Sequence, residues 1–164
     1  MKTLIKISIL FLLIVSVTGQ TKLSTGYGLT YPATEHSTLK TGNSFDAGLE
    51  LGLAPVNDIP VSIRTTISFS NYKAKDNGLS LTETGYKVEL VVGSKFYSTL
   101  GLGYNHLSGK TDNNYLMITA GLGYRKNFKS FGLFTEIHYE GNYKHNLYPD
   151  YISVSMKIGI SINL

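Results

Sequence analysis

Alternation of apolar and polar residues at a period of two recurs in eight stretches of this 164-residue chain. The stretches are residues 23–31, 44–53, 61–70, 82–92, 96–105, 115–125, 131–140 and 152–164. A period of two is that of a β-strand, whose successive side chains point to opposite faces of the sheet. Each stretch also has about the nine to eleven residues that a tilted strand needs to cross a bilayer.

The two faces of these strands differ in a way that indicates which one meets lipid. The apolar face carries no charged residue, whereas the polar face carries ten charges and eleven of the seventeen glycines. A lipid-facing Arg or Lys near the bilayer centre costs about 2–4 kcal/mol. Glycine weakens a water-facing strand, but small residues suit the interior of an eight-stranded barrel, which side chains only just fill. We therefore predict an all-β fold: a closed eight-stranded antiparallel up-and-down transmembrane β-barrel.

The connections between the strands alternate in length. Those at 32–43, 71–81, 106–114 and 141–151 are long and polar, and the others are mostly shorter, with 54–60 the longest of them. Outer-membrane barrels have long loops outside and short turns in the periplasm. The tyrosines of the apolar face lie mostly near strand ends, where an aromatic girdle is expected: Tyr27, Tyr31, Tyr86, Tyr104, Tyr124 and Tyr139.

The N-terminus has the pattern of a cleavable signal peptide. Lys2 and Lys6 provide the positive region, and residues 7–17 are apolar except for two serines. The apolar run is shorter than the roughly 20 residues of a membrane-spanning helix, and a small residue, Gly19, precedes the predicted cleavage site. We expect residues 1–19 to be removed during export.

The mature chain, residues 20–164, has the size of one domain. Its net charge falls from +4 to +2 once Lys2 and Lys6 are left out, and it has no run of basic residues, so nucleic-acid binding is not supported. The chain has no cysteine, which excludes disulfides and thiolate metal sites. No cofactor is expected.

The polar face supplies candidate residues for an interior salt-bridge lattice. These are Asp46, Glu50, Glu83, Glu89, Glu136 and Glu140 against Arg64, Lys87, Arg125 and Lys157. Charges enclosed in a narrow barrel must be paired, because a single buried charge is very unfavourable. His138 lies between two glutamates on this face. A proton-coupled or ion-conducting role is the alternative, but eight strands leave no aqueous channel.

This chain resembles the small eight-stranded outer-membrane barrels, the OmpX-like proteins and the barrel domain of OmpA. Its last eight residues look like the C-terminal assembly signal of such barrels, with Lys157, Gly159, Ile162 and Leu164 at the signal's positions. Leu164 departs from the aromatic residue that usually ends the signal. The resemblance implies outer-membrane localisation, with membrane lipid and the barrel-assembly machinery as partners.

Two alternatives stand beside a non-enzymatic role. Some small barrels are lipid A deacylases or a palmitoyltransferase, and they resemble this chain in size and topology. The deacylase pattern places a histidine and a serine two residues apart, but here Glu140 stands where the serine would follow His138. The second alternative is a soluble periplasmic ligand-binding barrel.

The external loops are the expected functional surface. The loop at 142–149 is the most aromatic, and Tyr143, His145 and Tyr148 are our candidates for contact with an unidentified external protein or ligand. His36, His106 and His145 are all expected in loops, at no spacing typical of a metal site. The sequence therefore favours a surface protein acting in envelope integrity, adhesion or surface interaction.

The periplasmic turns are expected to be basic. They are assigned Lys22, Lys95, Lys126 and Lys129 against a single acidic residue, Asp58.

Overall fold

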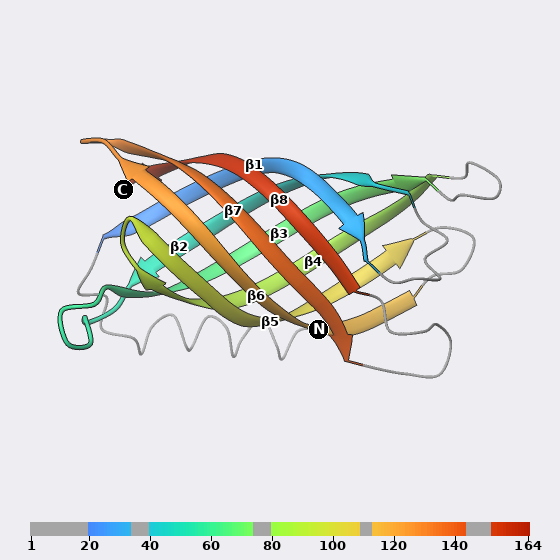
Figure 1. The fold of residues 1–164 in the computed structure, drawn as a ribbon, viewed down its shortest axis with the longest axis horizontal. Coiled ribbons are helices and arrows are strands. Elements are labelled where there is room, and N and C mark those ends of the chain that lie inside the picture. Colours follow the sequence, from blue (N-terminus) through green and yellow to red (C-terminus); the bar gives the residue numbers. More distant parts are fainter. Residues whose placement is uncertain (1–19, 34–39, 74–79, 109–112, 144–151) are drawn as a thin grey trace.

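The computed structural model describes residues 20–33, 40–73, 80–108, 113–143 and 152–164, so residues 1–19 and their predicted cleavage lie outside it. Eight antiparallel strands form a closed barrel in which each strand pairs with the next and the last pairs with the first (Figure 1). The strands are β1 (Thr21–Pro32), β2 (Gly42–Gly52), β3 (Val61–Lys73), β4 (Ser80–Gly93), β5 (Phe96–Ser108), β6 (Asn113–Asn127), β7 (Phe131–Tyr143) and β8 (Ile152–Asn163). The predicted fold class is confirmed.

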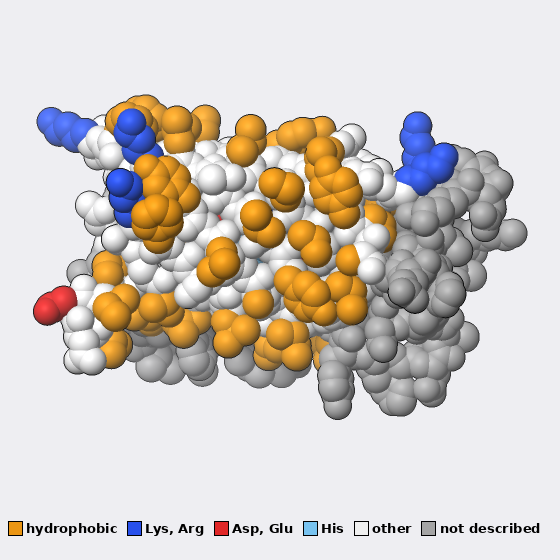
Figure 2. Space-filling view, viewed as in Figure 1, with side chains coloured by type: hydrophobic (Ala, Val, Ile, Leu, Met, Phe, Trp, Pro, Cys, Tyr) orange, Lys and Arg blue, Asp and Glu red, His pale blue; other side chains and the backbone are white. Residues whose placement is uncertain are grey.

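The outer surface of the barrel is apolar and its interior is polar. Leu100, Leu122 and Ile158 are each more than 60% exposed, whereas Glu89 and Lys157 are at most 4% exposed. Figure 2 shows hydrophobic side chains spread over the barrel wall, with basic side chains near its two ends. The predicted assignment of the two faces is therefore confirmed. Among the described residues, no helix has the length and apolar character needed to span a membrane.

Several strands extend further towards the long loops than the apolar alternation predicts. β3 continues to Lys73 and β5 to Ser108, because backbone pairing persists after the outward side chains have become polar. One such pair is Thr82 with Asn71, whose side chains are joined by a hydrogen bond of 3.0 Å. The placement of His106 in a loop is thus wrong: it lies in β5, with Nδ1 2.8 Å from Oδ1 of Asn114 on β6.

Aromatic and apolar side chains share the interior with the charges. Tyr72, Val91, Tyr97, Met117 and Phe134 are buried there. Glycines make room for them, as a Cβ added at Gly123 would lie only 2.6 Å from the hydroxyl of Tyr97. From the sequence pattern, only Phe134 was assigned to the polar face. The burial of the other four was not predicted.

Short turns connect the strands at the end of the barrel opposite the long loops. β4 ends at Gly93, whose φ of 117° is a conformation that residues with a side chain rarely adopt. Gly93 still pairs with Tyr97, and Ser94 and Lys95 then connect β4 to β5. In the 53–60 turn, Asn57 and Asp58 have positive φ values of 49° and 64°.

Candidate functional site: the charged interior of the barrel

Arg64 of β3 is the centre of the interior contacts. Its Nε and Nη2 donate to Oε2 of Glu89 on the neighbouring strand β4, at 3.1 and 2.9 Å. Its Nη1 donates across the lumen to Glu136 of β7. All three side chains are at most 4% exposed, so this guanidinium bridges two buried carboxylates.

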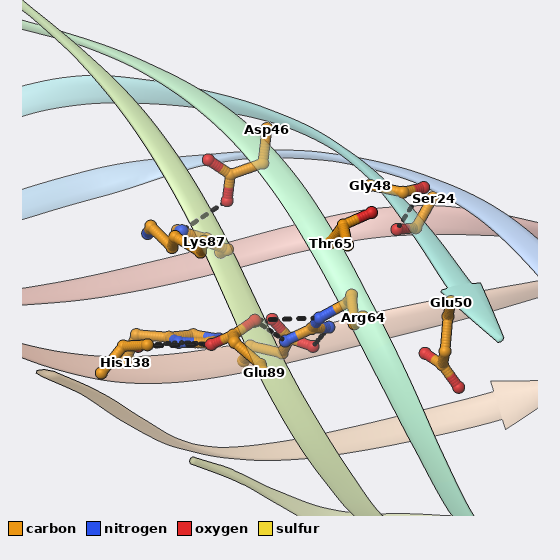
Figure 3. Close-up of polar contacts among 12 residues, drawn as sticks. Ser24, Asp46, Gly48, Glu50, Arg64, Thr65, Lys87, Glu89 and His138 are labelled. Carbon is orange, nitrogen blue, oxygen red and sulfur yellow. Dashed lines mark hydrogen bonds and ion pairs between the residues drawn. The ribbon is translucent and has the colours of Figure 1, made fainter. Parts of the chain in front are cut away.

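His138 extends this group of contacts on β7. Its Nε2 lies 2.7 Å from Oε2 of Glu136, and its Nδ1 lies 3.4 Å from Oε1 of Glu89. Thr119 donates to the same Glu89 oxygen at 3.2 Å, and the Tyr97 hydroxyl donates to Glu136 at 2.5 Å. Figure 3 shows contacts that run from His138 to Arg64. Each ring nitrogen of His138 therefore faces a carboxylate of the lattice.

Glu50 of β2 forms a second group nearer the short turns. Arg125 of β6 binds both of its oxygens, with N–O distances of 3.0 and 2.6 Å, and Ser62 donates to it at 3.0 Å. The Arg125 guanidinium also lies 4.8 Å from the centre of the Tyr97 ring. Such bidentate pairs are stronger than single hydrogen bonds and fix geometry. This group links β2 to β6 across the lumen.

Lys22 corrects the assignment of the basic turns. It lies in β1, largely buried, with Nζ 3.8 Å from Oε1 of Glu50. Position 22 has the same parity as the inward-facing Ser24 and Gly26, and the ladder with β2 places it opposite Glu50. It therefore belongs to the interior lattice and not to the turns.

The half of the interior nearer the long loops uses lysines. Lys87 of β4 pairs with Glu140 of β7, and Lys157 of β8 pairs with Asp46 of β2. These pairs also cross the lumen or skip a strand, so they connect parts of the chain that are far apart in sequence. The ten charged residues predicted for the lattice all lie inside the barrel. Glu83 is the exception among them, and the other nine make ion pairs: Asp46, Glu50, Glu89, Glu136, Glu140, Arg64, Lys87, Arg125 and Lys157. His138 lies with them, with its two ring nitrogens 2.7 and 3.4 Å from carboxylate oxygens.

Glu83 differs from the other interior carboxylates. It is 4% exposed, yet no cation of the described residues lies within 4 Å of it. Asn105 of β5 donates to one oxygen at 2.6 Å, and the Tyr115 hydroxyl of β6 donates to the other at 2.7 Å. Neutral donors thus hold a buried carboxyl group close to the loop end. The position of Glu83 in the sequence predicted its burial but did not predict that no Lys or Arg would pair with it.

The other candidate residues are placed as follows. Lys157 of the C-terminal signal faces the lumen, Gly159 lies against Phe134, and Ile162 and Leu164 are exposed on the outside. Tyr143 ends β7, and its side chain is not described; His145 and Tyr148 lie outside the described residues.

Potential metal ligands and the surroundings of His138 can be located in the described part of the chain. It contains no group of three or more potential metal ligands. A shallow depression on the outer surface is lined by Leu102, Leu116, Met117 and Ile118, none of which carries a nucleophile. His138 has both nitrogens engaged inside the barrel and faces away from the lipid side.

Comparison with known proteins concerns the fold. No protein-family description and no curated protein matches this sequence. Among solved structures, OprG from Pseudomonas aeruginosa is similar at 10% identity and a TM-score of 0.60, over 92% of this chain and 98% of OprG. Ail, the attachment invasion locus protein of Yersinia pestis, is similar at 15% identity and 0.56, over 89% and 99%. Neisserial surface protein A is similar at 13% identity and 0.51, over 88% and 96%. The predicted resemblance is therefore confirmed: this chain has the fold of the small eight-stranded outer-membrane barrels.

Proposed function

We propose that this chain is an integral outer-membrane protein, exported through a signal peptide at residues 1–19, which acts without catalysis at the cell surface. The observation that supports this most strongly is the distribution of side chains on the closed barrel. Apart from charged side chains at its two ends, its charges lie in the interior, and its outer wall exposes Leu, Ile, Val, Phe and Tyr. Soluble monomers rarely expose continuous apolar patches larger than a few hundred Å², whereas this surface suits acyl chains.

Closure of the sheet gives independent support. A bilayer core offers no water to backbone groups, so a sheet can cross it only when every edge strand is paired. Here β8 pairs with β1 over eleven residue pairs. A soluble periplasmic ligand-binding barrel would need its apolar side chains inside, where this chain places ion pairs.

A surface-contact role is favoured because side chains fill the interior of the barrel. Except for Glu83, its charged side chains pair with one another, and Tyr97 and Phe134 fill space in the same interior. The long loops are then the part of the chain left for recognition. One similar structure is of Ail in complex with the heparin analogue sucrose octasulfate. By analogy, we propose that the loops, with Tyr143, His145 and Tyr148 as first candidates, contact an external ligand in adhesion or envelope integrity.

Fractionation tests the localisation. The full chain should remain with outer membranes and need detergent for release, and it should migrate faster on a gel before boiling than after it. Release into osmotic-shock fluid would contradict membrane insertion and support the soluble alternative.

Two further assays test the role. Cells that express the chain should adhere to a heparin-coated surface more than vector controls, and a Y143A/H145A/Y148A variant should lose this gain while keeping its heat-modifiable migration. Equal adhesion of the variant would contradict the loop assignment.

Mass spectra of lipid A from deletion and overexpression strains test the enzymatic alternative, and we expect both to match the parent strain.

A further inference from the structure

A patch of lysines and aromatic rings lies on the outer surface at the short-turn end of β5 and β6. It consists of Lys95, Phe96, Tyr124, Lys126 and Phe128, here called the lysine–aromatic patch. The Lys95 ammonium lies 5.7 Å from the centre of the Tyr124 ring, and that of Lys126 lies 5.5 Å from the Phe128 ring. The Phe96 and Tyr124 rings pack at 5.1 Å.

Strand pairing explains why these residues meet. Phe96 is directly opposite Tyr124 in the β5–β6 ladder, and the Arg125 amide donates to the Lys95 carbonyl at 2.7 Å. Lys126 follows Tyr124 by two residues and so shares its outward face. Both lysines therefore lie on the turn side of the Phe96–Tyr124 pair. Figure 2 shows basic side chains beside hydrophobic ones at this end of the barrel.

No carboxylate among the described residues balances the charge of this patch. Within the described residues, neither Lys95, Lys126 nor the neighbouring Lys129 has a carboxylate within 4 Å. Asp58 is the single acidic residue of the three short connections, at 53–60, 94–95 and 128–130. By contrast, all five lysines and arginines of the interior are paired with carboxylates. An anion from outside the chain would complete the patch.

The position of the patch indicates where that anion comes from. Phe96 is 73% exposed, and Leu122, two residues before Tyr124 on the same face, is 71% exposed. The lysines therefore border the apolar wall directly. Tyrosine rings favour the headgroup level of a bilayer, and lysine stems lie along apolar surface while their ammonium groups reach polar surroundings. An anion at this height is one that a lipid carries.

We propose that the lysine–aromatic patch binds the phosphate of an anionic phospholipid in the leaflet that faces the short turns. Lys95 and Lys126 contact the phosphate, and Phe96, Tyr124 and Phe128 hold the lysines at the headgroup level. This inference depends on the membrane insertion proposed above. A lysine near an anionic surface strengthens association about fivefold, so loss of both should produce a large effect.

Native mass spectrometry tests this with the full chain refolded in nanodiscs of equal parts phosphatidylglycerol and phosphatidylcholine. The wild-type protein should retain phosphatidylglycerol at least fivefold more than phosphatidylcholine, and K95Q/K126Q should retain the two lipids about equally. K40Q/K73Q is the matched control, since it removes two exposed lysines at the opposite end, and it should keep the wild-type ratio. Y124L, which keeps the surface apolar but removes the ring below Lys95, should lower the ratio by a smaller factor.

The outcomes separate this inference from the proposed function. Heat-modifiable migration and protease protection report insertion for every variant before lipids are counted. Failure of the wild-type protein to insert overturns both proposals. Normal insertion with an unchanged lipid ratio in K95Q/K126Q overturns the lipid site alone, as does an equal loss in K40Q/K73Q.

Discussion

The two halves of the barrel interior compensate their buried carboxylates with different side chains. The turn-side cluster, Glu50, Glu89 and Glu136 with Lys22, Arg64, Arg125 and His138, is built around guanidinium groups that bind carboxylates through two or three nitrogens. The loop-side cluster, Asp46, Glu83 and Glu140 with Lys87 and Lys157, has single lysine pairs and one carboxyl group with neutral partners.

The turn-side cluster therefore holds its strands in a more fixed geometry than the loop-side cluster does. A planar guanidinium fixes the direction of each contact, whereas an ammonium acts as a point charge on a flexible stem. The turn-side cluster therefore fixes how β2, β3, β4, β6 and β7 face one another across the lumen. The loop-side cluster, with three carboxylates and two ammonium groups, leaves one acidic group that the fold does not require to be charged.

Removal of Arg64 should have the largest effect on stability. Arg64→Met leaves Glu89 and Glu136 in the interior with less compensation, and breaking a buried ion pair costs about 3–5 kcal/mol. Urea unfolding in detergent micelles, followed by gel migration, measures the loss. Arg64→Lys keeps the charge without the fork and should lose less. A change below about 1 kcal/mol in Arg64→Met would show that the turn-side cluster does not hold the barrel.

Carboxylates of the two clusters should respond differently to neutralisation. Glu136→Gln removes the negative charge that Arg64 and His138 contact, and puts an NH₂ donor in place of one acceptor oxygen, so it should destabilise by about 3 kcal/mol. Glu83→Gln removes no cation contact and should change the free energy of unfolding by less than about 1 kcal/mol, in either direction. The same unfolding assay compares the two variants, and equal losses would remove the distinction between the clusters.

Packing of the turn-side cluster can be tested through a glycine. Gly123→Ala places a methyl group against the Tyr97 ring and should destabilise the barrel by about 1–3 kcal/mol. Gly26→Ala is the matched control, because its added Cβ meets neighbours at 3.4 Å, which is ordinary contact. If Tyr97→Leu in the same chain fails to reduce the Gly123→Ala loss, the ring is not its cause.

Sequence predicted the strand number, both faces and the interior charges, because period-two alternation directly reports which side chains share a face. It did not predict that Tyr97 and Met117 lie inside, since an aromatic or apolar residue next to a strand end fits either side. Lys22 and His106 were misplaced because backbone pairing extends past the apolar alternation. The contact of Arg64 with Glu136, 72 residues apart, depends on how the closed sheet staggers its strands, which no local pattern encodes.

The central claim is that the apolar face meets lipid and the polar face fills the lumen, and labelling tests it most directly. The chain has no cysteine, so Leu122→Cys and Thr99→Cys each provide one site for an environment-sensitive fluorophore, the first outward and the second 4% exposed inside. In vesicles with spin-labelled acyl chains, we expect strong quenching at position 122 and little at position 99. Strong quenching at position 99 with none at position 122 would contradict the account.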